Sequence, residues 1–330
     1  MPFTPHSPMR RALLGAAAAA LAGARPVAAL AASTYPDKPV RLIVQVQAGT
    51  AADTMMRAMA EHVSQQWGQP IVMENRIGVA GTLGPATVAK SSRPDGYTLT
   101  VIPISLFRLP FMQEVNFDPR ADFTYIANLS AYTFGTVVGA DSKYRDFKSL
   151  IEDARARPGE ISYATPGIGS TQHLTMEQIS LHAGVRFNHV PFKGTPEAIA
   201  ALLGGHVDVV ADASAWTPAV ESGKARLLCT WGLTRPKRWK DQPTLTELGI
   251  PVVADSPCGI GGPHGMAPEV VKRINDAFRD ALDAPRVVQT LDNLQMVPRY
   301  MDTADYNRFI NTEIEASGKL IERLGLAKKA

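Results

Sequence analysis

Strand-like and helix-like segments alternate along most of this chain, and this order limits the folds open to it. Runs rich in β-branched residues at 40–44, 70–73 and 97–102 predict buried strands, while residues 54–66 carry apolar side chains at helical spacing. Alternating strands and helices with short links favour a parallel sheet with helices on both faces. We therefore expect an α/β fold.

A second alternating series begins further along the chain, and the pattern changes again in its last quarter. The remaining predicted strands lie at 136–139, 161–164, 207–211 and 225–229, and the remaining predicted helices at 85–89, 147–156, 170–182, 195–204, 268–284 and 303–324. The last two helices are amphipathic and follow one another without an intervening predicted strand.

Two α/β series in one chain of 330 residues predict two lobes, because chains of this size usually divide their hydrophobic core. We assign residues 32–133 and 256–330 to lobe 1 and residues 134–255 to lobe 2. The chain then crosses between the lobes near residues 134–135 and 257–259, where we expect a hinge.

The first residues, 1–31, have the composition of a cleaved export signal. Arg10 and Arg11 precede an apolar run at 12–24, and a small-x-small cleavage site follows. The run is shorter than the roughly 20 residues that span a bilayer. We predict a periplasmic protein without a stable membrane anchor, exported by a Tat or a Sec signal peptide, since the paired arginines suit the first route and do not exclude the second. An anchoring N-terminal helix is the alternative.

The charge of the exported chain argues against polyanionic partners. The leader holds three of the 34 basic residues and none of the 31 acidic ones, so the remainder carries 31 of each. Nucleic acids and anionic membranes bind basic surfaces. We therefore expect no nucleic-acid partner and no membrane-surface role.

Two cysteines, Cys229 and Cys258, leave two alternatives open. An even pair can form a disulfide in an oxidising compartment. The same residues can instead be two separate buried thiols, and the sequence does not choose between them.

Loops that follow the predicted strands are the candidate site, because ligands of open α/β sheets bind where strand ends meet helix N-termini. In the first such loop, Gly49 and Thr50 allow backbone N–H groups to approach an anion at the next helix. Asp53 either contacts the ligand or caps that helix. In the second lobe, Gly169, Ser170 and Thr171 repeat the arrangement, with hydroxyl groups beside unpaired helix N–H groups.

Three further residues complete the candidate set in the second lobe. Thr195 begins another helix, and Asp212 ends a strand where it can accept a hydrogen bond from a ligand amine or hydroxyl, or act as a turn residue. Trp216 follows closely. His173 is expected to be structural.

Motifs for catalysis and cofactors are absent from the sequence. There is no Gly-x-Ser-x-Gly elbow, no Walker loop, no complete dinucleotide fingerprint and no metal-ligand spacing among the histidines and cysteines. We expect no catalytic residues, no cofactor and no metal.

Several ordered motifs resemble the Bug family, the periplasmic receptors of tripartite tricarboxylate transporters. They lie at 35–40, 68–76, 94–99, 189–195, 202–208 and 243–249. The resemblance runs from about residue 35 to the C-terminus. It implies a two-lobed periplasmic-binding-protein fold (Venus flytrap, type II), with mixed, mainly parallel sheets flanked by helices. It also implies a small carboxylate ligand, held by two loops of the first lobe and helix starts of the second.

One departure from the family pattern concerns the first loop, where residues 45–50 replace the usual Pro-Phe-x-Pro-Gly-Gly. The change alters the stiffness of the loop, and Gln45 and Gln47 offer amide contacts. The second loop contains Ile104 and Ser105 and is more apolar than a citrate-like ligand suggests. Phe107 and Trp216 are candidates to flank an aromatic or branched acid, with ordinary packing as the alternative.

These observations predict a monomeric extracytoplasmic receptor that captures a small carboxylate and delivers it to membrane permease subunits. The closed form would dock on the permease, so no chemistry on the ligand is required. A ligand sensor for a two-component kinase is an alternative that uses the same surface. An exported hydrolase on the same scaffold is a further alternative, although no convincing nucleophile–base pair supports it.

Overall fold

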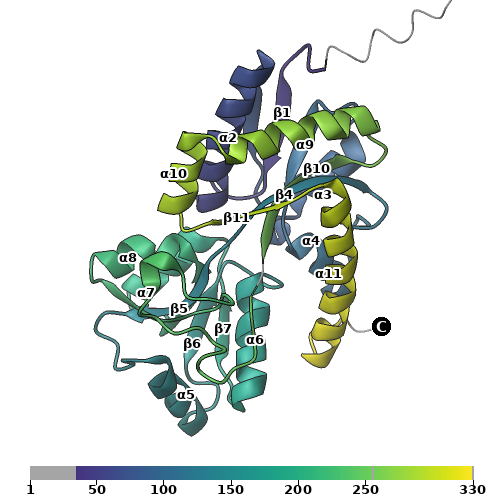
Figure 1. The fold of residues 1–330 in the computed structure, drawn as a ribbon. Helices are drawn as coiled ribbons and strands as arrows, with labels where there is room; N and C mark the ends of the chain where they lie inside the picture. The colour runs from purple at the N-terminus through teal and green to yellow at the C-terminus, as the bar shows by residue number, and fades with distance from the viewer. Residues whose placement is uncertain (1–34, 255, 329–330) are drawn as a thin grey trace, which may run out of the picture. The chain divides into compact units, whose positions relative to one another are not determined.

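The first of two β-sheets has six strands in the order β11-β4-β10-β3-β1-β2 (Figure 1). A computed structural model describes residues 35–254 and 256–328, and both sheets lie in the single compact unit Lys38–Ala330. The strands are β1 (Val40–Val44), β2 (Ile71–Asn75), β3 (Thr98–Ile102), β4 (Phe123–Ala131), β10 (Pro257–Pro263) and β11 (Val297–Met301). β1 pairs in parallel with β2 and β3, whereas β10 is antiparallel to both β3 and β4, and β11 is antiparallel to β4.

The second sheet has five strands in the order β7-β6-β8-β5-β9. Its strands are β5 (Phe134–Gly139), β6 (Ser162–Thr165), β7 (Asn188–Pro191), β8 (Val209–Ala213) and β9 (Ala225–Thr230). β6 is parallel to β7 and β8, and β5 is antiparallel to β8 and β9. Each sheet is therefore mixed, as expected for this fold.

Helices flank both sheets. They are α2 (Ala51–Trp67), α3 (Leu83–Ser91), α4 (Ser105–Met112), α5 (Phe147–Ala156), α6 (Thr171–Ala183), α7 (Thr195–Leu203), α8 (Thr217–Glu221), α9 (Pro268–Leu282), α10 (Pro285–Asn293) and α11 (Thr303–Arg323), with short 3-10 turns η3 (Val79–Gly81), η4 (Ser214–Trp216) and η5 (Lys237–Trp239). Helices α2, α9 and α10 pack together beside the first sheet, and α5 to α8 surround the second (Figure 1).

Local sequence signals explain several of the helix ends. The last turn of α2 is followed by Gly68 in the left-handed conformation, which favours glycine. Asp146 and Ser149 form a capping box at the start of α5. At α11, the Asp302 side chain accepts a hydrogen bond from the backbone N–H of Asp305.

The predicted alternation is confirmed for most elements, but it misses β4, β10 and β11, the strands whose antiparallel pairing makes the first sheet mixed. β10 is rich in glycine and proline, which single-sequence reasoning assigns to turns. Its glycines are required by close packing, because a Cβ at Gly259 would lie 2.5 Å from the Tyr306 hydroxyl and 2.6 Å from the Ala127 carbonyl oxygen. β11 and α10 lie between the two predicted C-terminal helices and were also missed.

The antiparallel pairing follows from the path of the chain. β4 leads out of the first sheet and β5 continues into the second, whereas β10 brings the chain back beside β4. Outgoing and returning strands therefore run in opposite directions. The backbone N–H of Tyr132 donates to the carbonyl of Ser256 at 3.3 Å and joins the two crossings.

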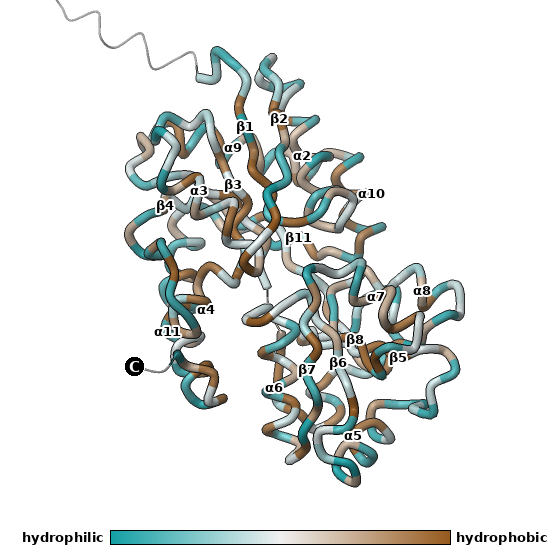
Figure 2. The backbone as a smooth tube through the Cα atoms, turned by 180° about the vertical axis from the view of Figure 1, so that it is seen from behind, coloured by the Kyte–Doolittle hydropathy of each residue, from teal (hydrophilic) through white to brown (hydrophobic). Residues whose placement is uncertain are grey.

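Burial follows the hydropathy pattern of the strands. In Figure 2 the inner strands β1 and β3 are coloured as hydrophobic, whereas α11 alternates between the two extremes. Among the described residues, no helix is long and apolar enough to cross a membrane. The predicted export signal lies outside the described residues.

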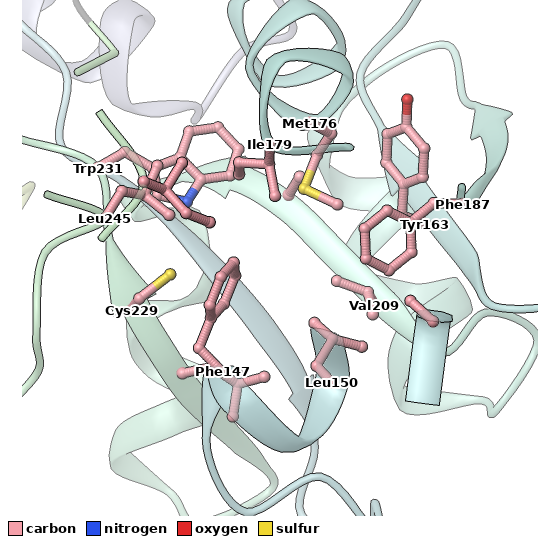
Figure 3. Packing of buried hydrophobic residues seen from close by; sticks show 14 of the residues in the cluster. Phe147, Leu150, Tyr163, Met176, Ile179, Phe187, Val209, Cys229, Trp231 and Leu245 are labelled. Carbon is pink, nitrogen blue, oxygen red and sulfur yellow. The ribbon is translucent and has the colours of Figure 1, made fainter. Parts of the chain in front are cut away.

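The core of the second lobe surrounds one of the two cysteines. Phe147, Tyr163, Met176 and Trp231 pack around the cluster that contains Cys229 (Figure 3). Cys258 is buried in β10 of the other sheet, and both thiols are free. Burial raises the pKa of each thiol to about 12, because the thiolate is poorly solvated in an apolar core.

We predict that both cysteines react in the denatured protein and neither reacts appreciably in the native one. The reactive species is the thiolate, and both burial and the raised pKa suppress it. Maleimide labelling without reductant, followed by intact mass measurement, would count two labels in denaturant. A single label, or none, would contradict the free-thiol assignment.

Candidate functional site

A cavity of about 690 Å³ lies between the loops of the two sheets. It is lined by residues at the carboxyl ends of the parallel strands and at the starts of the following helices, together with the chain crossings. The main contributing segments are 45–47, 50–52, 77–81, 103–105, 166–168, 170–172, 191–196 and 212–213. The strand-end rule applied to the sequence therefore located this cavity correctly.

The first lobe contributes a helix N-terminus whose backbone groups are not capped by a side chain. The Thr50 hydroxyl donates to the Gln47 carbonyl oxygen at 2.8 Å instead of accepting from helix N–H groups. Ala51 and Ala52 begin the helix and line the cavity. First-turn N–H groups have no partner within a helix and carry partial positive charge. This end of α2 is suited to an anion.

A strained loop forms another part of the first-lobe wall. Residues 78–81 all have positive φ, including Val79 at 48° and Ala80 at 52°. Such conformations are uncommon for residues other than glycine, and they cluster at functional sites. The Ser105 hydroxyl donates to the Ala80 carbonyl at 2.6 Å and holds the loop. The sequence marks this segment only as a glycine-rich turn.

The second lobe presents two helix starts, of which α6 is capped by a side chain and α7 is not. At α6, the Ser170 hydroxyl accepts from the backbone N–H of His173 at 3.2 Å. At α7, the Thr195 hydroxyl donates to Oδ1 of Asp212 at 3.2 Å. Gln172, in the first turn of α6, also donates to Oδ1 of Asp212, at 3.0 Å. Asp212 is therefore held by side chains from the first turns of both helices.

The carboxyl group of Asp212 is fully buried, and only one of its oxygens has a partner. Besides the two side chains, the backbone N–H of Ala213 donates to Oδ1 at 2.6 Å, while Oδ2 has no hydrogen-bond partner. Burial raises the pKa of Asp212 to about 6, and the three hydrogen bonds limit the rise. At neutral pH the group is mostly ionised.

The remaining wall of the cavity is largely apolar. Tyr132 and Phe134, from the first chain crossing, lie with ring centroids 5.9 Å apart, and Phe192 lines the opposite lobe. Ile77 and Ile168 are about half exposed at the lining, 46% and 51% respectively. Among the described lining residues, Lys193 and Asp212 carry the only formal charges, and Lys193 is exposed.

The histidines near the site are neutral structural groups. The rings of His173 and His189 stack with centroids 4.1 Å apart. Burial lowers the pKa of His173 to about 3 and that of His189 to about 4. His173 Nδ1 accepts from the Gly169 backbone N–H at 3.2 Å and supports the loop before α6. No cluster of three or more potential metal ligands occurs in the part of the chain that the structure describes.

Eight of the twelve predicted site residues line the cavity. They are Gln47, Thr50, Ile104, Ser105, Ser170, Thr171, Thr195 and Asp212. Gln45, named in the sequence as a candidate amide contact, lines the cavity as well. Sequence reasoning did not include the loop at 78–81, Tyr132 or Gln172, and of these only the glycine-rich turn was visible in the sequence.

Two predicted residues of the first loop, Gly49 and Asp53, do not line the cavity. Asp53 is 1% exposed. Its side chain accepts from the Gly49 backbone N–H at 2.9 Å and from Asn75 and Arg57 at 2.8 Å each. Burial opposes ionisation of Asp53, but these hydrogen bonds lower its pKa below the usual value. Asp53 therefore closes the loop onto α2, with Gly49 as its partner.

Trp216 of the second lobe and Phe107 of the first also lie outside the lining. Trp216 is fully buried and packs against Trp239 at 5.5 Å, with its indole N–H donating to the Asp212 carbonyl. Phe107 is likewise fully buried, against Tyr125. The expectation that Phe107 and Trp216 flank a ligand is therefore wrong, because both rings are needed to fill the cores.

Gly169, the other predicted residue that does not line the cavity, lies at a contact between the lobes. A Cβ at this position would lie 3.2 Å from Leu109 Cδ2 and 3.3 Å from Met112 Sδ, both on α4 of the first sheet's helices. Its φ of 77° also favours glycine. A larger residue would require the Leu109 and Met112 side chains to shift.

Arg108 makes a second contact between the lobes and was not predicted. It is 6% exposed, and it donates to the Thr171 hydroxyl of α6 at 3.0 Å and to Glu313 of α11 at 3.3 Å. At the cavity rim, Gln47 Nε2 donates to Glu197 at 3.1 Å. The sequence contained one indication of this role: Arg108 is the single charged residue in an otherwise apolar helical segment, and a buried charge is usually paired.

Comparison with known proteins agrees with this architecture. The model of the tripartite tricarboxylate transporter family receptor, TctC, matches residues 55–326. The chain is 43% identical over 318 residues to the UPF0065 protein in gbd 5'region of Cupriavidus necator, covering 96% of this chain and 97% of that one. It is 30% identical over 309 residues to Protein BugT of Bordetella pertussis, covering 92% and 94%.

Solved structures give the same result. The chain superposes on R. palustris Rpa4515 with adipate at a TM-score of 0.84 and 28% identity, covering 89% of this chain and 99% of that one. It superposes on MatC from Rhodopseudomonas palustris with bound malate at a TM-score of 0.80 and 26% identity, covering 87% and 100%. The extent of these matches, together with the two mixed sheets around one cavity, shows that this chain belongs to the Bug/TctC family of periplasmic solute-binding receptors.

Proposed function

We propose that this receptor captures a small carboxylate in the cavity between its lobes and delivers it unaltered to permease subunits of a tripartite tricarboxylate-type transporter. The supporting observation is the uncapped N-terminus of α2, with Ala51 and Ala52 at the cavity. Malate and adipate, bound by the two R. palustris neighbours, are both carboxylates. We further propose that the protein acts as a monomer in the periplasm after removal of residues 1–31.

The lobe division proposed from the sequence is supported by the membership of the two sheets. The strands of one sheet lie within 32–133 and 256–330, and those of the other within 134–255. We propose the hinge at the Tyr132–Ser256 pair, where the outgoing and returning segments are joined by a backbone hydrogen bond. Few residues at such a crossing need to change conformation for the lobes to open.

Contacts across the cavity support a mechanism of closure. Arg108 and Gln47 of the first lobe each donate to a side chain of the second, namely Thr171 and Glu197. These bonds form only when the lobes are close together. A ligand that contacts both lobes therefore shifts the population towards this closed arrangement, which is the form offered to the permease.

We predict that mono- or dicarboxylates bind more tightly than tricarboxylates. The described lining is largely apolar and contains no buried cation, so each additional carboxylate is poorly compensated on desolvation. Isothermal titration with a panel of carboxylates measures the order, and mass spectrometry of the denatured complex checks that the ligand mass is unchanged. Tightest binding of a tricarboxylate contradicts the prediction, and a chemically altered ligand contradicts the receptor role.

We predict that Arg108→Lys weakens ligand binding by about tenfold through loss of closure. A lysine retains the charge next to Glu313 but lacks the guanidinium fork that also reaches Thr171, and a hydrogen bond to a charged group contributes about 1.5–3 kcal/mol. The measurement is a double-mutant cycle with Thr171→Val, using titration affinities.

The cycle has a defined outcome. If the two side chains act through their mutual bond, the combined loss is smaller than the sum of the single losses. Additive losses contradict the closure contact. Lys90→Met, which removes an exposed ion pair with Asp122, is the matched surface control and is expected to leave affinity unchanged.

A further inference from the structure

The two lobes offer a ligand different polar surroundings. On the first lobe, the first turn of α2 has no side-chain cap and lines the cavity. On the second lobe, Ser170 caps α6, whereas α7 has no side-chain cap but begins beside the Asp212 carboxylate, which accepts from the Thr195 hydroxyl. A ligand carboxylate next to Asp212 would meet a like charge in a largely apolar cavity, where repulsion is strong.

The second lobe also carries an acceptor that has no donor. Asp212 lines the cavity, and its Oδ2 atom is buried and has no hydrogen-bond partner. A buried carboxylate oxygen without a hydrogen bond is costly, and such groups in native proteins require an explanation. All three protein donors, Gln172, Thr195 and the Ala213 N–H, meet the other oxygen. They hold the carboxyl group in place and leave Oδ2 as the oxygen that a donor of the ligand can satisfy.

We propose that the ligand binds in one orientation, with its carboxylate on the α2 end of the first lobe and a hydroxyl or ammonium group of its chain donating to Oδ2 of Asp212. This inference rests on the proposed function and narrows it. The substrate class is then a hydroxy- or amino-substituted small carboxylate. Asp212 is the residue that separates this class from plain carboxylates, because only a donor satisfies its free oxygen.

The titratable groups near Asp212 are either neutral or exposed, so the charge of Asp212 dominates the electrostatics of this part of the cavity. Tyr132 is neutral, since burial raises its pKa well above 10, with smaller contributions from Cys258 and Asp212. His173 on α6 is neutral because burial lowers its pKa. Glu197 on α7 is exposed and accepts from Gln47, and Lys193 is exposed at the rim.

The test compares matched ligands that differ only in the donor. Butanoate is compared with its hydroxy- and amino-substituted forms at carbons 2, 3 and 4, and succinate with malate and aspartate, by isothermal titration at pH 7.5. At least one substituted acid is expected to bind about tenfold or more tightly than its plain parent, the gain typical of a hydrogen bond to a charged group. Equal binding of all parents and derivatives overturns the proposal.

Asp212→Asn makes the test specific for the free oxygen. The amide oxygen still accepts from Gln172, Thr195 and the Ala213 N–H, while an NH₂ group replaces Oδ2 and donates instead of accepting. The preference for the substituted acid is expected to vanish, and plain parents are expected to bind as well as before or better. A preserved preference overturns the proposal. Asp208→Asn changes the charge equally just before β8, outside the lining, and is expected to retain the wild-type preference.

The pH dependence of the wild-type protein provides a readout that needs no variant. Asp212 has a pKa of about 6 without ligand, so it becomes protonated as the pH falls through 6 and accepts less strongly. Affinity for the substituted acid is therefore expected to fall between pH 7.5 and 5. A rise in affinity on acidification would show Asp212 donating a proton to a ligand carboxylate and would overturn the proposed orientation.

Failure of the proposed function is distinguishable from failure of this inference. If no carboxylate in either series binds, the receptor assignment itself is contradicted. If plain and substituted acids bind alike, the receptor assignment stands and the role of Asp212 is overturned.

Discussion

The antiparallel pairing of β4 with β10 is the constraint on which the two-lobed arrangement depends. These strands carry the chain out of the first sheet and back into it, and the Tyr132–Ser256 hydrogen bond joins the crossings. Because both crossings lie side by side, the strand ends of both sheets face one cavity. The glycines of β10 make this possible, since a side chain at Gly259 would collide with Tyr306 and with the neighbouring strand.

The cavity is therefore built from strand ends and helix starts, and its polarity follows from which starts remain open. α2 is uncapped because the Thr50 hydroxyl is directed to Gln47. In the second lobe Ser170 caps α6, while side chains at the starts of α6 and α7 hold the Asp212 carboxylate. The first lobe thus provides an uncapped helix N-terminus for an anion, whereas the second places an internal anion beside its helix starts.

Sequence reasoning recovered the elements with strong periodicity and the loops that follow parallel strands, because both depend on local pattern. It identified α5 with its observed bounds, and it placed Thr50, Ser170 and Asp212 at the cavity. It missed β10 because this strand is rich in glycine, which close packing requires there but which a sequence pattern assigns to turns. It misplaced Trp216 because a single sequence does not show whether an aromatic ring fills a core or a cleft.

Long-range contacts account for the other differences. Arg108 donates hydrogen bonds to Thr171 and Glu313, which are far from it in the chain. The local sequence pattern does not predict these partners. The role of Asp53 was open in the sequence and depends on Asn75, which lies on the neighbouring strand β2. Local pattern therefore gives the scaffold and the approximate site, whereas tertiary packing decides which side chains face the ligand.

The position of Cys258 in β10, one residue beyond the start of the strand that returns from the hinge, has a consequence for observing motion. The thiol is sealed in the ground state, so a reagent reaches it only during excursions that part the strands around it. The rate at which Cys258 is modified would therefore report how often the hinge region opens. Cys229 is enclosed in the core of the other lobe, so its modification rate would report only the unfolding of that lobe.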